Sequence, residues 1–463
     1  MRGGRSLLIL LVVALALGAY ILFVENKTTP AGDTSAVKKD KVFTADSSKF
    51  EEINVKAESG ETTTLRKKNG VWEIVAPETM TADSGEIGQL LSNLESLEVN
   101  SVVDEKPADV KDFGLDPPRF TVGFKAEGAA APMQLQVGKK TPTGSDLYAR
   151  VEGQPRVFLI NGYLESSFNK TPFGLRDKTI LTFDRDKADT LTIEKTGSPT
   201  LAFAKKGENW RLTKPYDARA ESGTVDGLVG KLAQAKMTSF ETADGTKDLK
   251  KYGLDKPQAT AIVGAGSARS TLVIGGKKDD GSLYARDLSR PAVFTVEGSM
   301  LDDLGKKPED VRKKEVFEFR AFNAHSFEFT YQGKTFTFEK QKATPPAAGA
   351  DQSTPPADVW KQTKPAPADP KKDPDQTKLT DLLTTLSNLK ADKFVEKPLT
   401  SGAELTVTVS FGETSALQKE TIKFRKSGNE VQATLIGESG AAVVNTADYD
   451  RAIAVIKELA GIK

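Results

Sequence analysis

The chain has 463 residues, of which 38% are hydrophobic and 28% charged, and its 65 basic and 64 acidic residues leave a formal net charge of +1. This balance gives no general attraction to nucleic acid or acidic ligands, and the length allows about three globular domains. The chain has no cysteine, which excludes disulfides, thiolate metal sites and cysteine nucleophiles.

The N-terminal segment predicts a membrane anchor. The residues from Leu7 to Val24 are almost all apolar, and at about 1.5 Å per residue such a helix is long enough to cross a bilayer core. Arg2 and Arg5 precede it, so the positive-inside rule places the N-terminus in the cytoplasm. We therefore expect a single-pass protein of the bacterial cytoplasmic (inner) membrane, with most of the chain periplasmic or otherwise extracytoplasmic.

The predicted anchor divides into a cytoplasmic stub over 1–5 and a transmembrane helix over 6–24. A cleavable signal peptide is the alternative, because Ala14 and Ala16 have the spacing of a cleavage site. Residues 25–42 are small and polar without periodicity, which predicts a flexible linker between the membrane and the first domain.

The rest of the chain contains tandem copies of one domain. Four motifs recur at a spacing of 136 to 139 residues: Trp72 to Pro77 with Trp210 to Pro215, Ala82-Asp-Ser-Gly85 with Ala220-Glu-Ser-Gly223, Phe113-Gly-Leu-Asp116 with Tyr252-Gly-Leu-Asp255, and Leu147-Tyr-Ala-Arg150 with Leu283-Tyr-Ala-Arg286. Solenoid repeats are only about 20–50 residues long, so this spacing indicates duplicated domains. We name them repeat 1 (43–187) and repeat 2 (188–321).

Each copy is predicted to be an α+β domain, with a mostly antiparallel sheet packed against one or two helices in the order β-β-α-β-β-β-β-α. Asn69-Gly70 lies between two strand-like runs and predicts a hairpin turn. After the Ala-[Asp/Glu]-Ser motif, apolar residues follow a helical spacing, and Asp83 or Ser84 is a suitable N-cap. This buried stripe occurs three times: Ile87, Leu90, Leu91, Leu94, Leu97; Val225, Leu228, Val229, Leu232, Ala235; and Leu379, Leu382, Leu383, Leu386, Leu389.

The third stripe belongs to a degenerate copy, repeat 3 (322–463). This copy keeps the opening strands, the tryptophan and a closing helix, but it lacks the Gly-Leu-Asp and Leu-Tyr-Ala-Arg motifs. Two Pro/Ala-rich inserts, 342–357 and 366–376, flank Trp360 and are too polar to form a core.

Few residues have the types and spacings that catalysis requires. His325 is the single histidine, no Gly-x-Ser-x-Gly motif is present, and no cluster of His, Cys and carboxylates suggests a metal site. We therefore predict no catalytic, cofactor-binding or metal-binding residues, and no cofactor. An enzyme that uses Asp116 or Asp255 is the remaining alternative, although both fit better as turn residues.

The residues that recur between copies are the best candidates for binding. Tyr148 and Arg150 alternate along one strand, as do Tyr284 and Arg286, so each pair shares one face of the sheet and forms a candidate binding surface. A tyrosine packed on the sheet beside a solvated arginine is the structural alternative. The three tryptophans and the two aspartates of the Gly-Leu-Asp motif are predicted to be structural anchors of the repeats: Trp72, Trp210, Trp360, Asp116 and Asp255.

Together, Trp-x4-Pro, Ala-[Asp/Glu]-Ser, the leucine-striped helix, [Phe/Tyr]-Gly-Leu-Asp and Leu-Tyr-Ala-Arg resemble an uncharacterised bacterial domain family, a domain of unknown function. Members of this family are anchored in the membrane, are often in tandem, and are commonly encoded beside ABC-type transporters of the gliding-motility kind. The resemblance covers about residues 43–320 well and the remainder weakly. It implies an extracytoplasmic accessory partner of a membrane complex.

The sequence thus predicts a non-catalytic, membrane-anchored scaffold or accessory protein. The resemblance makes an ABC-type transporter complex the expected partner, and the N-terminal helix attaches the chain to the membrane; nucleic acid is not an expected partner. A cell-envelope module that binds glycan or lipid through the Tyr/Arg faces is the alternative function.

Overall fold

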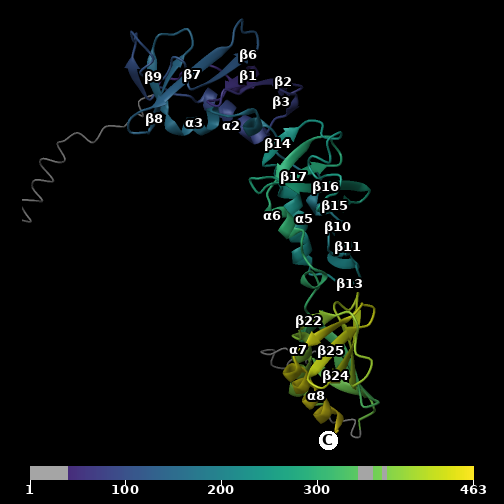
Figure 1. Ribbon diagram of the computed structural model, residues 1–463. Helices are drawn as coiled ribbons and strands as arrows, with labels where there is room; N and C mark the ends of the chain where they lie inside the picture. Colours follow the sequence, from purple (N-terminus) through teal and green to yellow (C-terminus); the bar gives the residue numbers. More distant parts are fainter. Residues whose placement is uncertain (1–39, 343–357, 368–372, 463) are drawn as a thin grey trace, which may run out of the picture. The chain divides into compact units, whose positions relative to one another are not determined.

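The computed structural model describes residues 40–342, 358–367 and 373–462 (Figure 1). The predicted stub, transmembrane helix and most of the linker lie outside these residues, as does nearly all of the first Pro/Ala-rich insert and part of the second. None of the helices within the described ranges is long and apolar enough to span a membrane. The chain divides into two compact units, with unit 1 ending at Lys178 and unit 2 beginning at Thr179.

Unit 1 contains one nine-stranded sheet in the order β4-β3-β2-β1-β6-β7-β8-β9-β5. Its strands are β1 (Phe50–Lys56), β2 (Thr62–Lys68), β3 (Val71–Ala76), β4 (Met80–Thr81), β5 (Ser101–Asp104), β6 (Phe120–Ala126), β7 (Met133–Lys140), β8 (Asp146–Val151) and β9 (Val157–Asn161). Its helices are η2 (Ser47–Lys49), α2 (Ser84–Glu95), η3 (Gly162–Leu164), α3 (Glu165–Phe168) and α4 (Pro172–Leu175).

Unit 2 begins with a second nine-stranded sheet in the equivalent order, β13-β12-β11-β10-β15-β16-β17-β18-β14. Its strands are β10 (Thr190–Lys195), β11 (Leu201–Lys206), β12 (Asn209–Lys214), β13 (Ala218–Arg219), β14 (Ser239–Thr242), β15 (Ala259–Ala265), β16 (Ala268–Lys277), β17 (Leu283–Asp287) and β18 (Val293–Val296). Its helices are η4 (Arg185–Lys187), α5 (Ser222–Gln234), α6 (Ser299–Asp303) and η5 (Pro308–Asp310).

The third sheet has eight strands in the order β21-β20-β19-β23-β24-β25-β26-β22. Repeat 3 therefore keeps the strand order except for the edge strand β4 or β13, although it lacks the Gly-Leu-Asp and Leu-Tyr-Ala-Arg motifs. Its strands are β19 (Ala324–Tyr331), β20 (Lys334–Gln341), β21 (Val359–Lys364), β22 (Ala391–Val395), β23 (Ala403–Phe411), β24 (Gln418–Ser427), β25 (Glu430–Leu435) and β26 (Ala441–Val444). Its helices are η6 (Ala321–Asn323), α7 (Gln376–Ser387) and α8 (Thr446–Ala460), the last two in mutual contact.

The long helix of each repeat joins opposite edges of its sheet. Helix α2 follows the strands at one edge, and the chain after it forms β5 at the other edge; α5 with β14 and α7 with β22 repeat this crossing. The apolar stripes explain why each helix lies on the sheet, since Leu90, Leu228 and Leu382 are at most 4% exposed. Asp83 is the N-cap of α2, accepting hydrogen bonds from the Gly85 and Glu86 amides at 2.9 and 3.1 Å.

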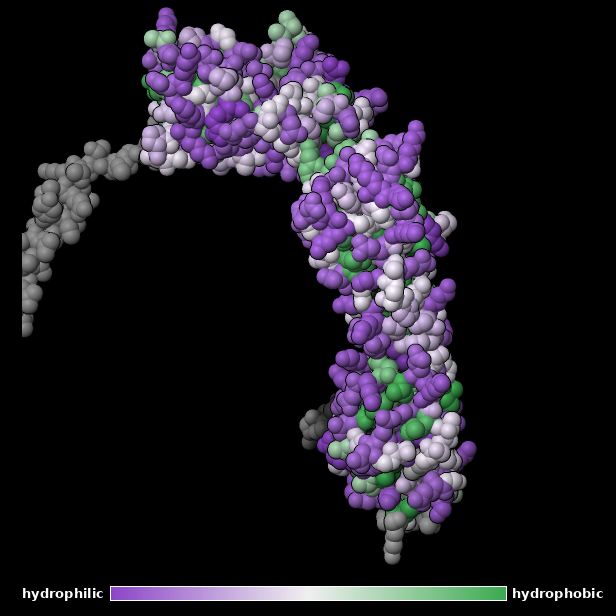
Figure 2. Space-filling view, in the orientation of Figure 1, coloured by the Kyte–Doolittle hydropathy of each residue, from purple (hydrophilic) through white to green (hydrophobic). Residues whose placement is uncertain are grey.

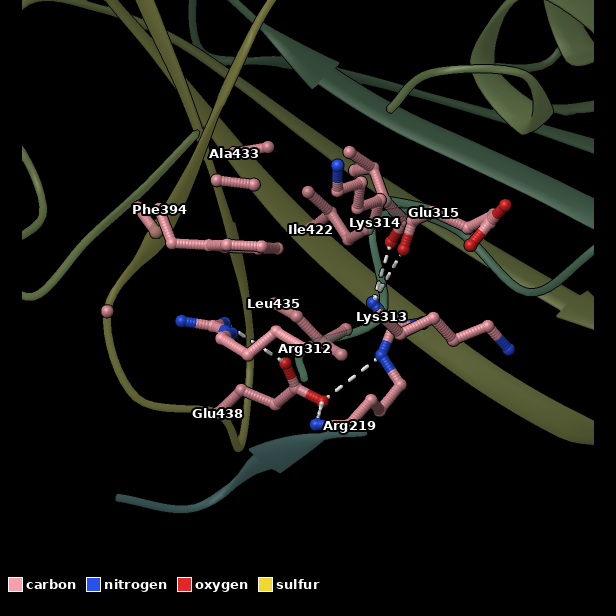
Figure 3. A pocket seen from close by; sticks show the side chains of 14 residues that line it. Arg219, Arg312, Lys313, Lys314, Glu315, Phe394, Ile422, Ala433, Leu435 and Glu438 are labelled. Atoms are coloured by element: carbon pink, nitrogen blue, oxygen red, sulfur yellow. Dashed lines mark hydrogen bonds and ion pairs between the residues drawn. The ribbon is translucent and has the colours of Figure 1, made fainter. Parts of the chain in front are cut away.

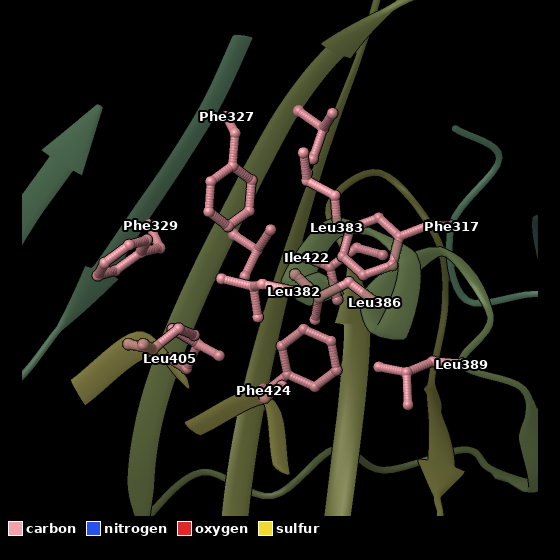
Figure 4. Packing of buried hydrophobic residues seen from close by; sticks show 14 of the residues in the cluster. Phe317, Phe327, Phe329, Leu382, Leu383, Leu386, Leu389, Leu405, Ile422 and Phe424 are labelled. Atoms are coloured by element: carbon pink, nitrogen blue, oxygen red, sulfur yellow. The ribbon is translucent and has the colours of Figure 1, made fainter. Parts of the chain in front are cut away.

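The core of repeat 3 shows this packing in detail (Figure 4). Leucines of α7 meet aromatic and aliphatic side chains from β19, β23 and β24, and the ring centroids of Phe317 and Phe319 are 5.1 Å apart. The face of the molecule seen in Figure 2 is mainly hydrophilic, with hydrophobic residues in small separate areas. Three antiparallel sheets with few helices confirm a repeated, sheet-rich arrangement of domains.

Three expectations differ from the structure. The predicted order of elements has too few strands: it has two before the long helix where repeats 1 and 2 have four, and it omits β5 and β14, short segments that pair with strands some 55 residues later in the chain. Unit 2 begins at Thr179, before the predicted boundary at 187, because Thr179 bridges to Lys236 within repeat 2. The end of the predicted linker belongs to the domain, since the Val99 amide donates to the Asp40 carbonyl at 2.9 Å.

Candidate functional site

The recurring Gly-Leu-Asp motif lies in a loop that packs on the sheet. We call these segments the covering loops: residues 105–119 between β5 and β6, and 243–258 between β14 and β15. The amides of Lys139 and Gly276 donate to the carbonyls of Phe113 and Tyr252 at 2.8 and 2.7 Å, so each loop is hydrogen-bonded to β7 or β16.

Glycine permits this contact on the strand side as well as in the loop. Gly114 and Gly253 have φ values of +69° and +65°, which favour glycine. A Cβ added at Gly138 would lie 2.1 Å from the Phe113 carbonyl oxygen, and one at Gly275 would lie 2.3 Å from that of Tyr252. The backbone of the loop therefore touches the backbone of the strand in both repeats.

Tyr148 and Arg150 support the covering loop of repeat 1. The Tyr148 and Phe113 ring centroids are 5.0 Å apart. Arg150 donates from Nε to Gln136 Oε1 at 2.6 Å and from Nη2 to the Leu115 carbonyl at 3.3 Å. Both side chains are partly buried, and the acceptors of Arg150 belong to unit 1 itself.

Tyr284 and Arg286 occupy the equivalent positions in repeat 2. The Tyr284 and Tyr252 ring centroids are 5.1 Å apart, so the aromatic contact with the covering loop is kept. The Nε of Arg286 is shielded from solvent and has no hydrogen-bond partner in the part of the chain that the structure describes. The two Tyr/Arg pairs lie in different units, and within each unit the tyrosine packs against the covering loop.

The tryptophans connect each opening hairpin to its helix. Trp210 is 1% exposed, and its Nε1 donates to Asp226 Oδ1 on α5 at 2.7 Å. Trp360 is 4% exposed, and its amide donates to Gln376 Oε1 at the start of α7 at 2.8 Å. Trp72 is partly buried and packs against the core of unit 1.

The remaining predicted residues lie apart from these contacts. Asp116 and Asp255 are exposed at the turn that follows each Gly-Leu pair. His325 is at the start of β19 with its Nε2 2.7 Å from the Gly412 carbonyl. Among the residues that the structure describes, no group of three or more His, Asp or Glu side chains could hold a metal ion.

A second polar site joins repeats 2 and 3 within unit 2 (Figure 3). Arg219 donates from Nε to Glu438 at 3.1 Å and from Nη1 to Glu420 at 3.2 Å. Its Nη2 donates to the carbonyls of Glu315 and Val316 at 3.3 and 2.9 Å, in the segment that leads into repeat 3. Every side-chain nitrogen of Arg219 therefore has an acceptor at the junction, and those of Nε and Nη1 belong to repeat 3.

The acidic partners of Arg219 are buried. The side chains of Glu420 and Glu438 are 9% and 7% exposed, and Glu420 also accepts from the Glu318 amide at 2.9 Å. Burial raises the pKa of Glu420, and it outweighs the lowering effects of the Glu318 amide and the Arg219 charge. A buried cation with hydrogen-bonded acids makes the junction costly to break.

Arg312 extends this cluster into a groove. Its guanidinium lies 4.1 Å from the Phe394 ring centroid and 5.4 Å from that of Tyr216, and Nη2 is 3.7 Å from Glu438 Oε2. The groove has a volume of about 1000 Å³, and the charged residues that line it are of both signs: Lys306, Arg312, Lys314, Lys393, Glu309, Asp310, Asp392 and Glu396. Aromatic surfaces beside mixed charges can bind a polar ligand or a peptide.

The motif comparison missed Arg219, Glu438 and the glycine pair Gly138/Gly275. Arg219 could have been found because repeat 1 has Thr81 at the equivalent position, so the two copies differ there in charge. Glu438 belongs to the degenerate repeat and has no counterpart that would single it out. Gly138 and Gly275 could have been found because they occupy equivalent positions in the two copies, in the segments Val-Gly-Lys and Ile-Gly-Gly.

Comparison with known proteins gives one family. The family described as Domain of unknown function (DUF4340) matches residues 72–209 and 210–410, and the two matched segments begin at equivalent tryptophans, Trp72 and Trp210. No curated protein and no solved structure matches the chain.

Proposed function

The chain belongs to the DUF4340 family, and on that premise we propose that it is a non-catalytic scaffold, anchored in the bacterial inner membrane, that binds a membrane complex outside the cytoplasm. The observation that supports this role most is the junction at Arg219, which joins repeats 2 and 3 into one compact unit. Two domains fixed to each other can present a larger continuous surface than two domains on a flexible linker.

Two features of the sequence supply the location and the partner. The apolar run from Leu7 to Val24, preceded by Arg2 and Arg5, supports a membrane anchor with the domains outside. The resemblance of the repeated motifs to domains encoded beside ABC-type transporters makes such a transporter the proposed partner.

Crosslinking in cells tests this proposal. A photo-reactive amino acid would replace Leu288, which is 53% exposed in repeat 2, and Leu417, which is 52% exposed in repeat 3, in separate full-length chains. Mass spectrometry of the captured proteins should identify transporter subunits. A full-length chain without the photo-reactive residue is the control. Capture of no membrane protein from either position, or full function of a cytoplasmic chain lacking 1–24, would contradict the scaffold role.

The second candidate is a module that binds envelope glycan or lipid, and the groove beside Arg312 favours it. Tyr216 and Phe394 offer aromatic surfaces there, and the Tyr216 hydroxyl can donate a hydrogen bond. Binding of envelope fragments by the full-length chain, lost in Tyr216→Ala and retained in Tyr163→Ala, would support this candidate. Tyr163 is a suitable control because it is 64% exposed and lies in unit 1.

A further inference from the structure

Arg286 is a half-buried cation without a direct acceptor. Its Nε is shielded from solvent and unpaired, and no hydrogen bond or ion pair of Arg286 exists among the described residues. The terminal nitrogens Nη1 and Nη2 are not shielded in this way, so the end of the guanidinium reaches solvent. Leaving a buried N–H without a hydrogen bond is costly, so an arginine kept in this state calls for an explanation.

In each of the other two repeats, an arginine of the sheet has a backbone carbonyl as its acceptor. Arg150, on β8 of repeat 1, donates to the covering-loop carbonyl of Leu115. Arg425 of repeat 3 lies on β24, the equivalent of the adjacent strand β7, and donates to the carbonyl of Leu399 at 2.9 Å. The cross-strand neighbour of Arg150 is Gln136, which accepts from it, whereas the neighbour of Arg286 is Val273, which cannot. Repeat 2 keeps the arginine but has lost the acceptor.

Tyr284 and Arg286 are the partly exposed side chains of this group. Tyr252, Leu254 and Val273 form a small buried apolar cluster, each at most 7% exposed, and Tyr284 packs against it. Tyrosine and arginine are among the residue types that contribute most to protein–protein binding.

The charged neighbours of Arg286 are already engaged. Lys278 is paired with Glu241 at 2.7 Å. Hydrogen bonds from the Thr246 side chain and amide hold the pKa of Asp244 below its usual value, with smaller contributions from the positive charges of Lys247 and Arg286. Asp244 therefore influences Arg286 electrostatically without forming an ion pair with it, and the guanidinium can accept an external anion.

We propose that Arg286 binds a carboxylate of the protein partner, an aspartate or glutamate side chain that meets Nη1 and Nη2 end-on while Tyr284 supplies apolar contact. The planar guanidinium fork matches a carboxylate in geometry and charge, and its half-buried stem limits the entropy lost on binding. This inference rests on the proposed scaffold role and gives the partner's contact group a chemical identity.

Nuclear magnetic resonance of arginine side chains tests the inference without knowledge of the partner. The full-length chain, 15N-labelled at arginine in phosphatidylcholine nanodiscs, would be titrated with N-acetyl-glutamate amide and, separately, with N-acetyl-glutamine amide. The Nε–Hε signal of Arg286, assigned by its loss in Arg286→Lys, should shift saturably with the glutamate probe alone. The Arg150 signal, from an arginine that already has acceptors, should not move.

Three results would overturn the inference: equal responses to the two probes, an equal shift of Arg150, or no shift at all. A response to inorganic phosphate or to phosphatidylglycerol nanodiscs, without one to the glutamate probe, would also overturn it and assign the site to phosphate. The probe replaces the partner, so the two experiments can fail separately. If crosslinking recovers transporter subunits but the Arg286 signal does not shift, only this inference is refuted. A shifted Arg286 without crosslinked subunits would refute the transporter assignment instead.

Discussion

Repeats 1 and 2 have the same strand order, yet each places an arginine-centred cluster where the other has a neutral residue. In repeat 1, Arg119 pairs with Glu58 and Glu165 at 2.7 and 2.6 Å, and the equivalent residue of repeat 2 is Gln258. In repeat 2, Arg219 joins the next repeat, and its equivalent in repeat 1 is Thr81.

The two clusters also differ in their exposure to solvent. Glu58 is 47% exposed, whereas Glu420 and Glu438 are less than 10% exposed. Water screens the first cluster and stabilises its acids when the arginine is removed, but it cannot do so for the second. Similar ion pairs in the same fold therefore contribute differently to stability, and the buried cluster lies at the junction between domains.

The strongest test of this difference replaces each arginine with the neutral residue that the other copy has at the equivalent position. Arg219→Thr should destabilise unit 2 by about 3–5 kcal/mol, because buried Glu420 loses its cation and Glu438 keeps only the longer contacts with Arg312 and Arg211, at 3.7 and 3.8 Å. Arg119→Gln should cost unit 1 at most about 1 kcal/mol. Hydrogen–deuterium exchange with mass spectrometry would measure the exchange protection of both units in the same chain. Similar protection losses in the two variants would show that burial does not separate the clusters.

The contact between covering loop and strand provides the next test. Gly275→Ala should destabilise the loop of repeat 2 by about 1–3 kcal/mol, because its Cβ would lie 2.3 Å from the Tyr252 carbonyl oxygen. Gly276→Ala is the matched control, since a Cβ there meets that oxygen at 3.4 Å and repeat 1 has Lys139 at this position. Exchange protection of residues 243–258 gives the measurement, and equal effects of both variants would contradict the proposed close approach.

Arg150 and Arg286, the arginines of the Leu-Tyr-Ala-Arg motif, should respond differently to the same change. Arg150→Gln removes the donors to Leu115 and Gln136, and it should reduce the stability of the first covering loop by about 1 kcal/mol. Arg286→Gln should leave the second loop unchanged, because it breaks no hydrogen bond. Exchange rates of 105–119 and 243–258 would be compared in the two variants. Destabilisation by Arg286→Gln would mean that this arginine has a structural role.

The smallest expected difference between the two clusters is in how the stability of each unit depends on pH. Glu420 has a raised pKa in the folded state, so it holds more protons there than in the unfolded chain, and its contribution to the stability of unit 2 falls as pH rises from about 4.5 through the raised pKa. Hydrogen bonding to Arg119 lowers the pKa of Glu58, so its contribution to unit 1 is present above about pH 4.5 and is lost on acidification.

The comparison would be made from exchange protection of each unit between pH 4 and 7, with Glu420→Gln as the control. This variant should remove the fall of unit 2 stability with rising pH and leave unit 1 unaffected. An identical pH profile for the wild type and Glu420→Gln would contradict the assignment to Glu420.

The sequence determined the features that depend on local spacing or on internal repetition. The motif spacing predicted the tandem copies, the apolar stripes predicted α2, α5 and α7, and Asp83 was one of two predicted N-caps. These features could be predicted because helix periodicity, capping and turn chemistry act over a few residues, and because a second copy tests each pattern.

Tertiary structure decided which polar groups meet. Arg219 and Glu438 are 219 residues apart in the chain, and no local pattern relates them. The sequence placed Arg150 and Arg286 in one motif, yet the first has acceptors in its own unit and the second has none among the described residues, because Gln136 and Val273 lie beside them only after strands pair. The chemistry of a guanidinium depends on the acceptors and the water around it, and folding sets both.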